Sequence, residues 1–178
     1  ATPPVTYALD RYEISVAPSL AALARSGSTP AAGPVVAVAG PGVEDVEPEL
    51  AALEAAFGAR GVAVLRGDRA SEAEVRQVAP TAGLLHFAAH ARPNDAEPSF
   101  ARLNLVPADG DDGRLHAYEI EGLRLPGSLV VLSACETGAG RLLAGEGVLS
   151  LSRAFLRAGA SGTVATLYVD GQAVGQNA

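Results

Sequence analysis

The chain has 178 residues and a formal net charge of −7, with 48% hydrophobic but only 4% aromatic residues. This length fits one domain that buries roughly 70% of its unfolded surface, in a core built from Val, Leu and Ala. The basic residues are all arginines and form no cluster or stripe along the sequence, which argues against nucleic-acid binding. No apolar run approaches the ~20 residues that span a bilayer, so we expect no membrane segment. The single cysteine, Cys135, fits a reducing cytoplasm.

The beginning of the chain reads as a connection rather than as part of the core. Residues 1–12 are rich in proline, and we expect them to form an N-terminal connection to a domain that spans residues 13–178. Pro18 and Ser19 open a short helical pattern that Gly27 ends, and residues 26–34 have the composition of a loop. The sequence shows neither an internal repeat nor a second domain, and we expect residues 168–178 to have no helix or strand partner.

From residue 35 onward, strand and helix patterns alternate. Buried strands are expected at residues 35–39, 61–65, 83–88, 129–134 and 163–167. Helical patterns cover residues 46–58, 71–78, 117–123 and 146–158, and Ser71 with Glu74 forms the capping box that opens the second of them. A small hairpin is expected from Leu103 and Leu105 to Leu115, across the turn at residues 109–113, whereas residues 91–98 read as polar and irregular. The alternation predicts a single α/β domain with a mostly parallel sheet covered by helices on both faces.

Two reactive side chains follow two of the predicted strands. His90 comes directly after the strand at residues 83–88, and Cys135 comes at the end of the strand that begins at Leu129. Function gathers at the carboxyl ends of parallel strands, so neighbouring strands would bring the imidazole and the thiol together. An imidazole can take the proton of a thiol and return it to a leaving amine. The alternative is that Cys135 is a buried small residue, and the pattern alone leaves both interpretations open.

Several blocks of the sequence resemble the CHAT domains, which are caspase-like and separase-like domains found downstream of tetratricopeptide repeats in bacteria. The blocks are LLHFAAH (84–90), ARLNL (101–105), DGRLHAYEI (112–120), LVVLSACETG (129–138), GEGVLSLSRAFLRAGA (145–160) and TVATLYVD (163–170). The resemblance covers residues 12–173. It implies a caspase-like (flavodoxin-like) fold, here without its last elements, and in active members a His–Cys dyad peptidase.

The resemblance also implies a role for individual residues. His90 is the general base and Cys135 the nucleophile, and the N–H groups of Ala91 and Cys135 hold the oxyanion. In most relatives a glycine stands in place of Ala91, so a backbone that needs a positive φ would be strained here. Asp170, with Glu136 as a second acid, is the expected substrate-binding residue and would favour a basic residue before the cleaved bond.

Other patterns suggest weaker sites. His86 and His90 are four residues apart, but on a strand they lie roughly 13 Å from each other, so we expect His86 to be a core histidine rather than a zinc ligand. His116 is expected on the surface. The glycines at residues 138–140 and 145–147, and more weakly those at 40–42, could approach a phosphate, but a loop beside the nucleophile explains the first two better. The acids at residues 109–112 lack the glutamate that ends a calcium loop and read as a hairpin turn.

These observations favour a cytoplasmic cysteine endopeptidase that needs no cofactor or metal and acts on a protein or peptide. A regulatory partner would act through upstream repeats, and neither nucleic acid nor membrane is an expected partner. The alternative is an inactive interaction module that keeps the fold. A nucleotide or phosphate binder is a distant third hypothesis.

Overall fold

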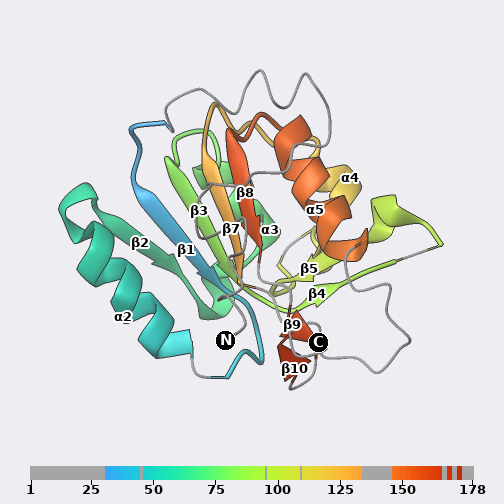
Figure 1. The fold of residues 1–178 in the computed structure, drawn as a ribbon, viewed down its shortest axis with the longest axis horizontal. Coiled ribbons are helices and arrows are strands. Elements are labelled where there is room, and N and C mark those ends of the chain that lie inside the picture. Colours follow the sequence, from blue (N-terminus) through green and yellow to red (C-terminus); the bar gives the residue numbers. More distant parts are fainter. Residues whose placement is uncertain are drawn as a thin grey trace, which may run out of the picture.

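The fold is built around one parallel sheet, shown in Figure 1. The computed structural model describes residues 31–44, 46–94, 96–108, 110–133, 146–165, 168–169 and 172–173. Five strands pair in the order β2-β1-β3-β7-β8, and every pairing is parallel. Their bounds are β1 (Val35–Ala39), β2 (Val62–Leu65), β3 (Leu84–Ala88), β7 (Leu129–Ser133) and β8 (Gly162–Ala165). Each agrees with a predicted strand to within a few residues, so the predicted α/β class and caspase-like sheet are confirmed.

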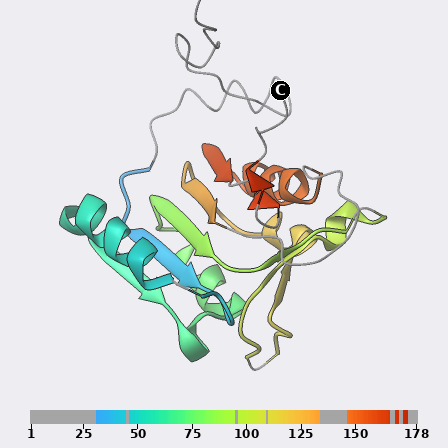
Figure 2. The ribbon, with the colours of Figure 1, turned by 60° about the horizontal axis from the view of Figure 1, so that its bottom comes forward.

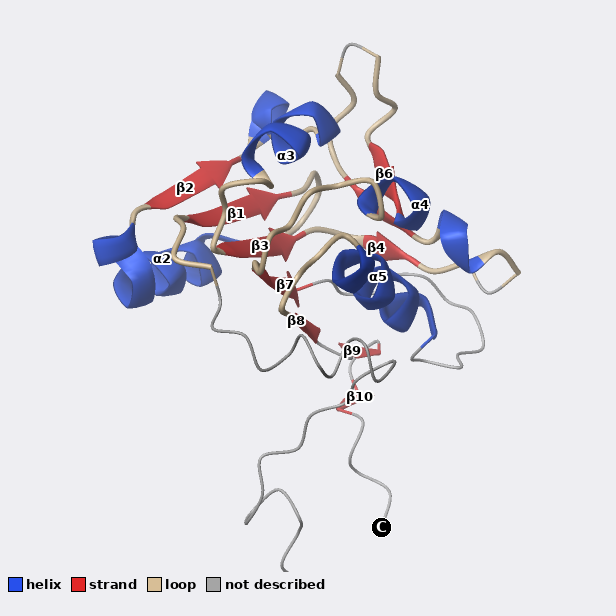
Figure 3. Cartoon of the chain, turned by 90° about the horizontal axis from the view of Figure 1, so that it is seen from above, coloured by secondary structure: helices blue, strands red, loops and turns tan. Residues whose placement is uncertain are grey.

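Helices lie on both sides of this sheet. Figure 3 shows α2 (Val46–Phe57) on one side and α3 (Glu72–Val78), α4 (Ala117–Ile120) and α5 (Glu146–Arg157) on the other. The larger core lies on the side of α3, α4 and α5, where Phe87 of β3 packs against Phe155 of α5 with ring centroids 5.4 Å apart. The α2 side is held by smaller residues, with Leu50 as the buried anchor of the helix. None of the helices in these described ranges has the length and apolar character that a membrane span requires.

A second, smaller sheet follows β3 directly. It consists of β4 (Ala91–Arg92), β5 (Arg102–Asn104) and β6 (Arg114–His116), which pair antiparallel in the order β4-β5-β6. The hairpin between β5 and β6 confirms the predicted turn, and Figure 2 shows its tip projecting away from the large sheet. The prediction of an irregular chain at residues 91–98 is wrong at its start, because Ala91 and Arg92 find strand partners far along the sequence.

Two predictions about the chain ends have different outcomes. The expectation that residues 168–178 lack a strand partner is wrong, because β9 (Tyr168–Val169) pairs antiparallel with β10 (Gln172–Ala173). The predicted short helix after Pro18 lies outside the described residues. The short 3-10 helices of the fold span residues 58–60, 67–69 and 98–100.

A buried carboxylate fastens the hairpin to the large sheet's helical layer. Ser71 caps α3 by accepting a hydrogen bond from Glu74 N, as its capping box predicts. The next residue, Glu72, is 1% exposed, and its Oε1 accepts hydrogen bonds from the backbone N–H groups of Gly113 and Arg114, both at 3.0 Å. Its Oε2 lies 3.4 Å from Nη1 of Arg76. Burial raises the pKa of Glu72, with further contributions from nearby carboxylates, against the opposing effect of its donors.

Candidate active site

The strands that carry the two predicted catalytic residues are neighbours. β3 pairs with β7 in parallel, with Leu84 opposite Leu129 and Ala88 opposite Ser133. Both strands therefore end at the same edge of the sheet, where the carboxyl ends of parallel strands form the usual place for a site. His90 lies two residues beyond the end of β3. His90 therefore lies at the edge of the sheet that the sequence predicts to hold the site.

The ring of His90 is held by a backbone carbonyl from the loop after β1. Its Nε2 lies 3.0 Å from the carbonyl oxygen of Gly42. A carbonyl oxygen only accepts hydrogen bonds, so the neutral ring must carry its proton on Nε2 and leave Nδ1 without one. Nδ1 is therefore the nitrogen that can accept a proton from a nucleophile. The contact thus fixes both the tautomer and the orientation of the ring.

Two glycines allow this loop to approach His90 so closely. Gly42 has a φ of +72°, a left-handed conformation that other residues adopt only with strain. At Gly40, a Cβ atom would lie 2.8 Å from the Cβ of Ala89 and 2.8 Å from the carbonyl oxygen of Asn104. Gly40 N also donates to Ala88 O at 2.8 Å, which joins the end of β1 to the end of β3. These glycines, weak candidates for a phosphate loop, support the histidine instead.

Ala91 presents its N–H group at the free edge of the small sheet. Asn104 N donates to His90 O at 2.8 Å, so along the antiparallel ladder Ala91 and Leu103 form the pair without mutual hydrogen bonds. The N–H of Ala91 therefore points away from β5, and β4 is the edge strand of its sheet. Because Ala91 begins a strand, its backbone is extended and needs no positive φ. The strain expected from alanine at a position where relatives have glycine does not arise.

The other predicted site residues, Cys135, Glu136 and Asp170, lie outside the described residues. The register of the described strands can still be compared with the position of Cys135 in the sequence. β3 and β7 pair with a constant offset of 45 positions, and the same 45 positions separate His90 from Cys135 in the sequence.

The remaining histidines occupy different environments. His86 is 4% exposed, as predicted for a core histidine, and its Nε2 lies 3.0 Å from Oε1 of Glu49 on α2. That contact is close but poorly directed, and neither ring nitrogen makes a well-formed hydrogen bond. Burial lowers the pKa of His86, and the Glu49 carboxylate opposes this effect. His116 is partly exposed at the start of α4, where its backbone N–H bonds to Oε2 of Glu119 at 2.9 Å.

The weaker sites considered from the sequence gain no support. In the described ranges, no group of three or more His, Cys, Asp or Glu side chains is placed to hold a metal ion. The acids of the hairpin turn have protein partners: Asp111 pairs with Arg76, and Asp112 accepts a hydrogen bond from Arg114 N at 2.9 Å. The glycines at residues 138–140 lie outside the described part of the chain.

Sequence reasoning missed the contribution of Gly42, because a backbone carbonyl has no residue type that could mark it. The available signal was the position of the segment Gly40-Pro41-Gly42, directly after a buried strand that the alternation places beside β3. A glycine-rich segment at that edge of a sheet indicates that its backbone comes close to another group. That group can be a phosphate, but here it is the ring of His90.

The family model of the CHAT domain matches residues 2–173, nearly the whole chain. No curated protein matches the chain.

Proposed function

The chain belongs to the CHAT domain family, a caspase-like and peptidase-related family, and we propose that it is a cysteine endopeptidase with His90 as general base and Cys135 as nucleophile. The observation that carries the proposal is the hydrogen bond between His90 Nε2 and Gly42 O at the edge where β3 and β7 both end. It prepares Nδ1 to accept a proton. The shared offset of 45 positions supports Cys135 as the donor of that proton.

The proposed reaction has two stages. The proton of the Cys135 thiol passes to Nδ1 of His90, and the thiolate attacks the carbonyl carbon of the scissile peptide bond. The electron pair of the carbonyl moves to its oxygen, which the N–H groups of Ala91 and Cys135 stabilise. The amine then leaves with the proton from Nδ1. Water, deprotonated by the same nitrogen, hydrolyses the thioester and restores the thiol.

Cleavage of a panel of peptide reporters tests this function. Wild-type protein should cleave at least one reporter, and Cys135→Ala should reduce the rate to background, because no other cysteine can replace the nucleophile. A thiol paired with an imidazole should also react rapidly with iodoacetamide near neutral pH, whereas a packed thiol reacts slowly. If wild type cleaves nothing and its thiol is slow to react, the chain is an inactive interaction module that keeps the fold.

The residue before the cleaved bond is a separate part of the proposal. A carboxylate at Asp170, with Glu136 as a second candidate, would favour Arg or Lys at that position. Reporters that differ only there measure the preference. Asp170→Asn should then remove most of the difference between basic and neutral reporters.

Ala91→Pro tests the oxyanion role of the Ala91 N–H without removing a ladder hydrogen bond. Proline is accepted on an edge strand where its nitrogen faces away from the sheet, which is the position of Ala91. We expect kcat to fall about 100-fold, because one donor to the oxyanion is lost. Ala91→Gly keeps the N–H and is the matched control, with kcat within a few-fold of wild type. An Ala91→Pro protein that folds and retains wild-type kcat would remove Ala91 from the mechanism.

A further inference from the structure

The small sheet has two chemically different faces. Successive residues of a strand point to opposite sides, so the registers assign each residue of the small sheet to one of two faces. One face holds Ala91, Leu103 and Leu115, which are 4%, 0% and 0% exposed and belong to the core. The opposite face is partly or fully exposed and holds His90, Arg92, Arg102, Asn104, Arg114 and His116. We call this second set the basic face.

The basic face gathers positive charge in a protein whose net charge is −7. The register places Arg92 opposite Arg102, and Arg102 opposite His116. Arg92 and Arg102 are therefore cross-strand neighbours on this face, and Arg114 lies on the next strand. Arg102 Nε donates to Asn104 Oδ1 at 3.3 Å, a neutral partner that orients the guanidinium. Among the described carboxylates, none forms an ion pair with Arg102 or Arg114.

The same face includes the proposed catalytic base. His90 is joined to Asn104 by the hydrogen bond from Asn104 N to His90 O, and Asn104 lies opposite Arg114. The proposed catalytic histidine and the arginines are therefore parts of one continuous surface. A peptide bound at His90 would have the guanidinium groups within reach of its flanking residues.

Exposed aromatic rings border the basic face. Phe100 and Tyr118 are 44% and 49% exposed, although the chain has few aromatic residues to place in its core. His116 stacks on Tyr118 with ring centroids 5.2 Å apart, and Phe100 meets both rings edge-on. Exposed aromatic and arginine side chains together are the composition of protein-binding surfaces.

From this arrangement we propose that the basic face binds an acidic segment of the protein substrate, to one side of the bond that is cut. The proposal rests on the proposed peptidase function, because it takes His90 as the point to which the substrate is delivered. Guanidinium groups recognise carboxylates through paired hydrogen bonds, and the aromatic border supplies contact area for neighbouring side chains. The proposed preference for a basic residue before the cleaved bond is compatible with an acidic segment, because the two concern different positions of the substrate.

An acidic peptide fits this face better than a nucleic acid does. Nucleic-acid binding rests on the neutralisation of many phosphates along an extended basic surface. Here the arginines of one short sheet are surrounded by a chain of net negative charge, which repels a long polyanion. A short run of Asp or Glu within an otherwise mixed peptide meets only the basic face.

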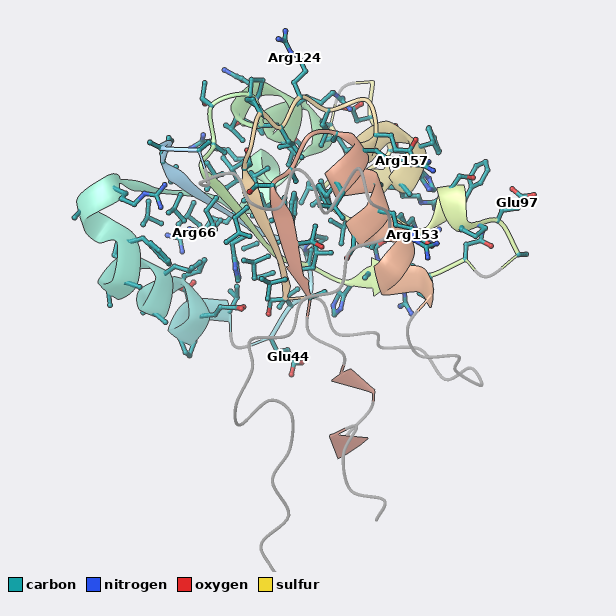
Figure 4. All side chains as sticks on the ribbon, turned by 45° about the horizontal axis from the view of Figure 1, so that its top comes forward. Glu44, Arg66, Glu97, Arg124, Arg153 and Arg157 are labelled. Atoms are coloured by element: carbon teal, nitrogen blue, oxygen red, sulfur yellow. The ribbon has the colours of Figure 1, made fainter. Side chains whose placement is uncertain are left out.

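The test measures binding without cleavage. The full chain carrying Cys135→Ala is titrated into a fluorescein-labelled peptide with four glutamates, and into the same peptide with four glutamines. At low ionic strength we expect the acidic peptide to bind about 10-fold more tightly, and Arg102→Gln or Arg114→Gln to weaken it about 3-fold each. Arg124→Gln is the matched control, because it changes the net charge by the same amount. Figure 4 shows Arg124 at the opposite end of the molecule from Glu44, and Glu44 marks the loop whose Gly42 contacts His90. The Arg124→Gln change should leave the affinity unchanged.

Three results would overturn the proposal: equal affinity for the two peptides, equal weakening by Arg124→Gln and Arg114→Gln, or a single-stranded RNA oligomer that binds the basic face more tightly than the acidic peptide. A failed peptidase function gives a different result. In that case wild type cleaves no reporter, while the binding difference and its loss in the arginine variants can still be measured.

Discussion

Replacing His90 with alanine is expected to lower kcat/KM by about 1,000-fold at pH 7, within the range found for general bases. In the proposed mechanism, this change removes the acceptor of the thiol proton and also the group that protonates the leaving amine. KM should change little, since His90 is held by Gly42 O and the role proposed for it is proton transfer. Measurement of kcat and KM with the best reporter at pH 5.5–9.5 gives both effects.

The pH dependence separates loss of the base from damage to the site. A free cysteine ionises near pH 8.5, so activity of the His90→Ala protein should rise with pH as the thiolate forms without help. Added imidazole should restore part of the activity at neutral pH, because the removed side chain leaves space for it. Unchanged thermal stability is the control for folding. A variant that keeps more than about a third of the wild-type kcat/KM would exclude His90 as the base.

The sequence predicts the parts of the fold that hydrophobic burial controls. β1 and β3 are buried at every position, as parallel strands covered on both faces are, whereas the residues of β7 alternate between partly buried and buried. The apolar runs of all three strands are visible without a structure. Helix α3 is marked by its cap at Ser71. The position of His90 at the edge that holds the proposed active site follows from these strands, since it needs only their order and direction.

The remaining features depend on contacts that no local pattern encodes. β4 has only two residues, and they become a strand because β5 lies beside them. The support of His90 comes from the backbone of Gly42, 48 positions earlier. The basic face requires the registers of two strand pairs, because its arginines are scattered in the sequence and meet only when Arg92, Arg102 and His116 are brought opposite one another. The absence of a basic cluster in the sequence therefore does not exclude a basic surface.

Glu72→Ala is expected to destabilise the protein by about 2–4 kcal/mol, because it leaves the buried N–H of Gly113 without its acceptor and takes away one of the two acceptors of the Arg114 N–H, the other being Asp112 Oδ1. For a chain of this length, that corresponds to a fall in Tm of roughly 6–12 °C. Glu74→Ala, two residues along the same helix, is the matched control. Its ion pair with Arg69 is largely exposed, and its loss should cost less than about 1 kcal/mol. Chemical denaturation of the three proteins gives the free energies of unfolding.

Glu72→Gln isolates the charge from the hydrogen bonds. The amide oxygen can still accept from Gly113 and Arg114, so we expect it to recover most of the stability that alanine loses. The raised pKa of Glu72 means that the folded protein binds this proton more tightly than the unfolded chain does. Ionised Glu72 therefore contributes least above its folded pKa, and wild type should gain stability relative to Glu72→Gln as the pH falls from 7 toward the unfolded value near 4.5. A difference that shrinks or stays constant over this range would show that its donors, rather than burial, control the ionisation of Glu72.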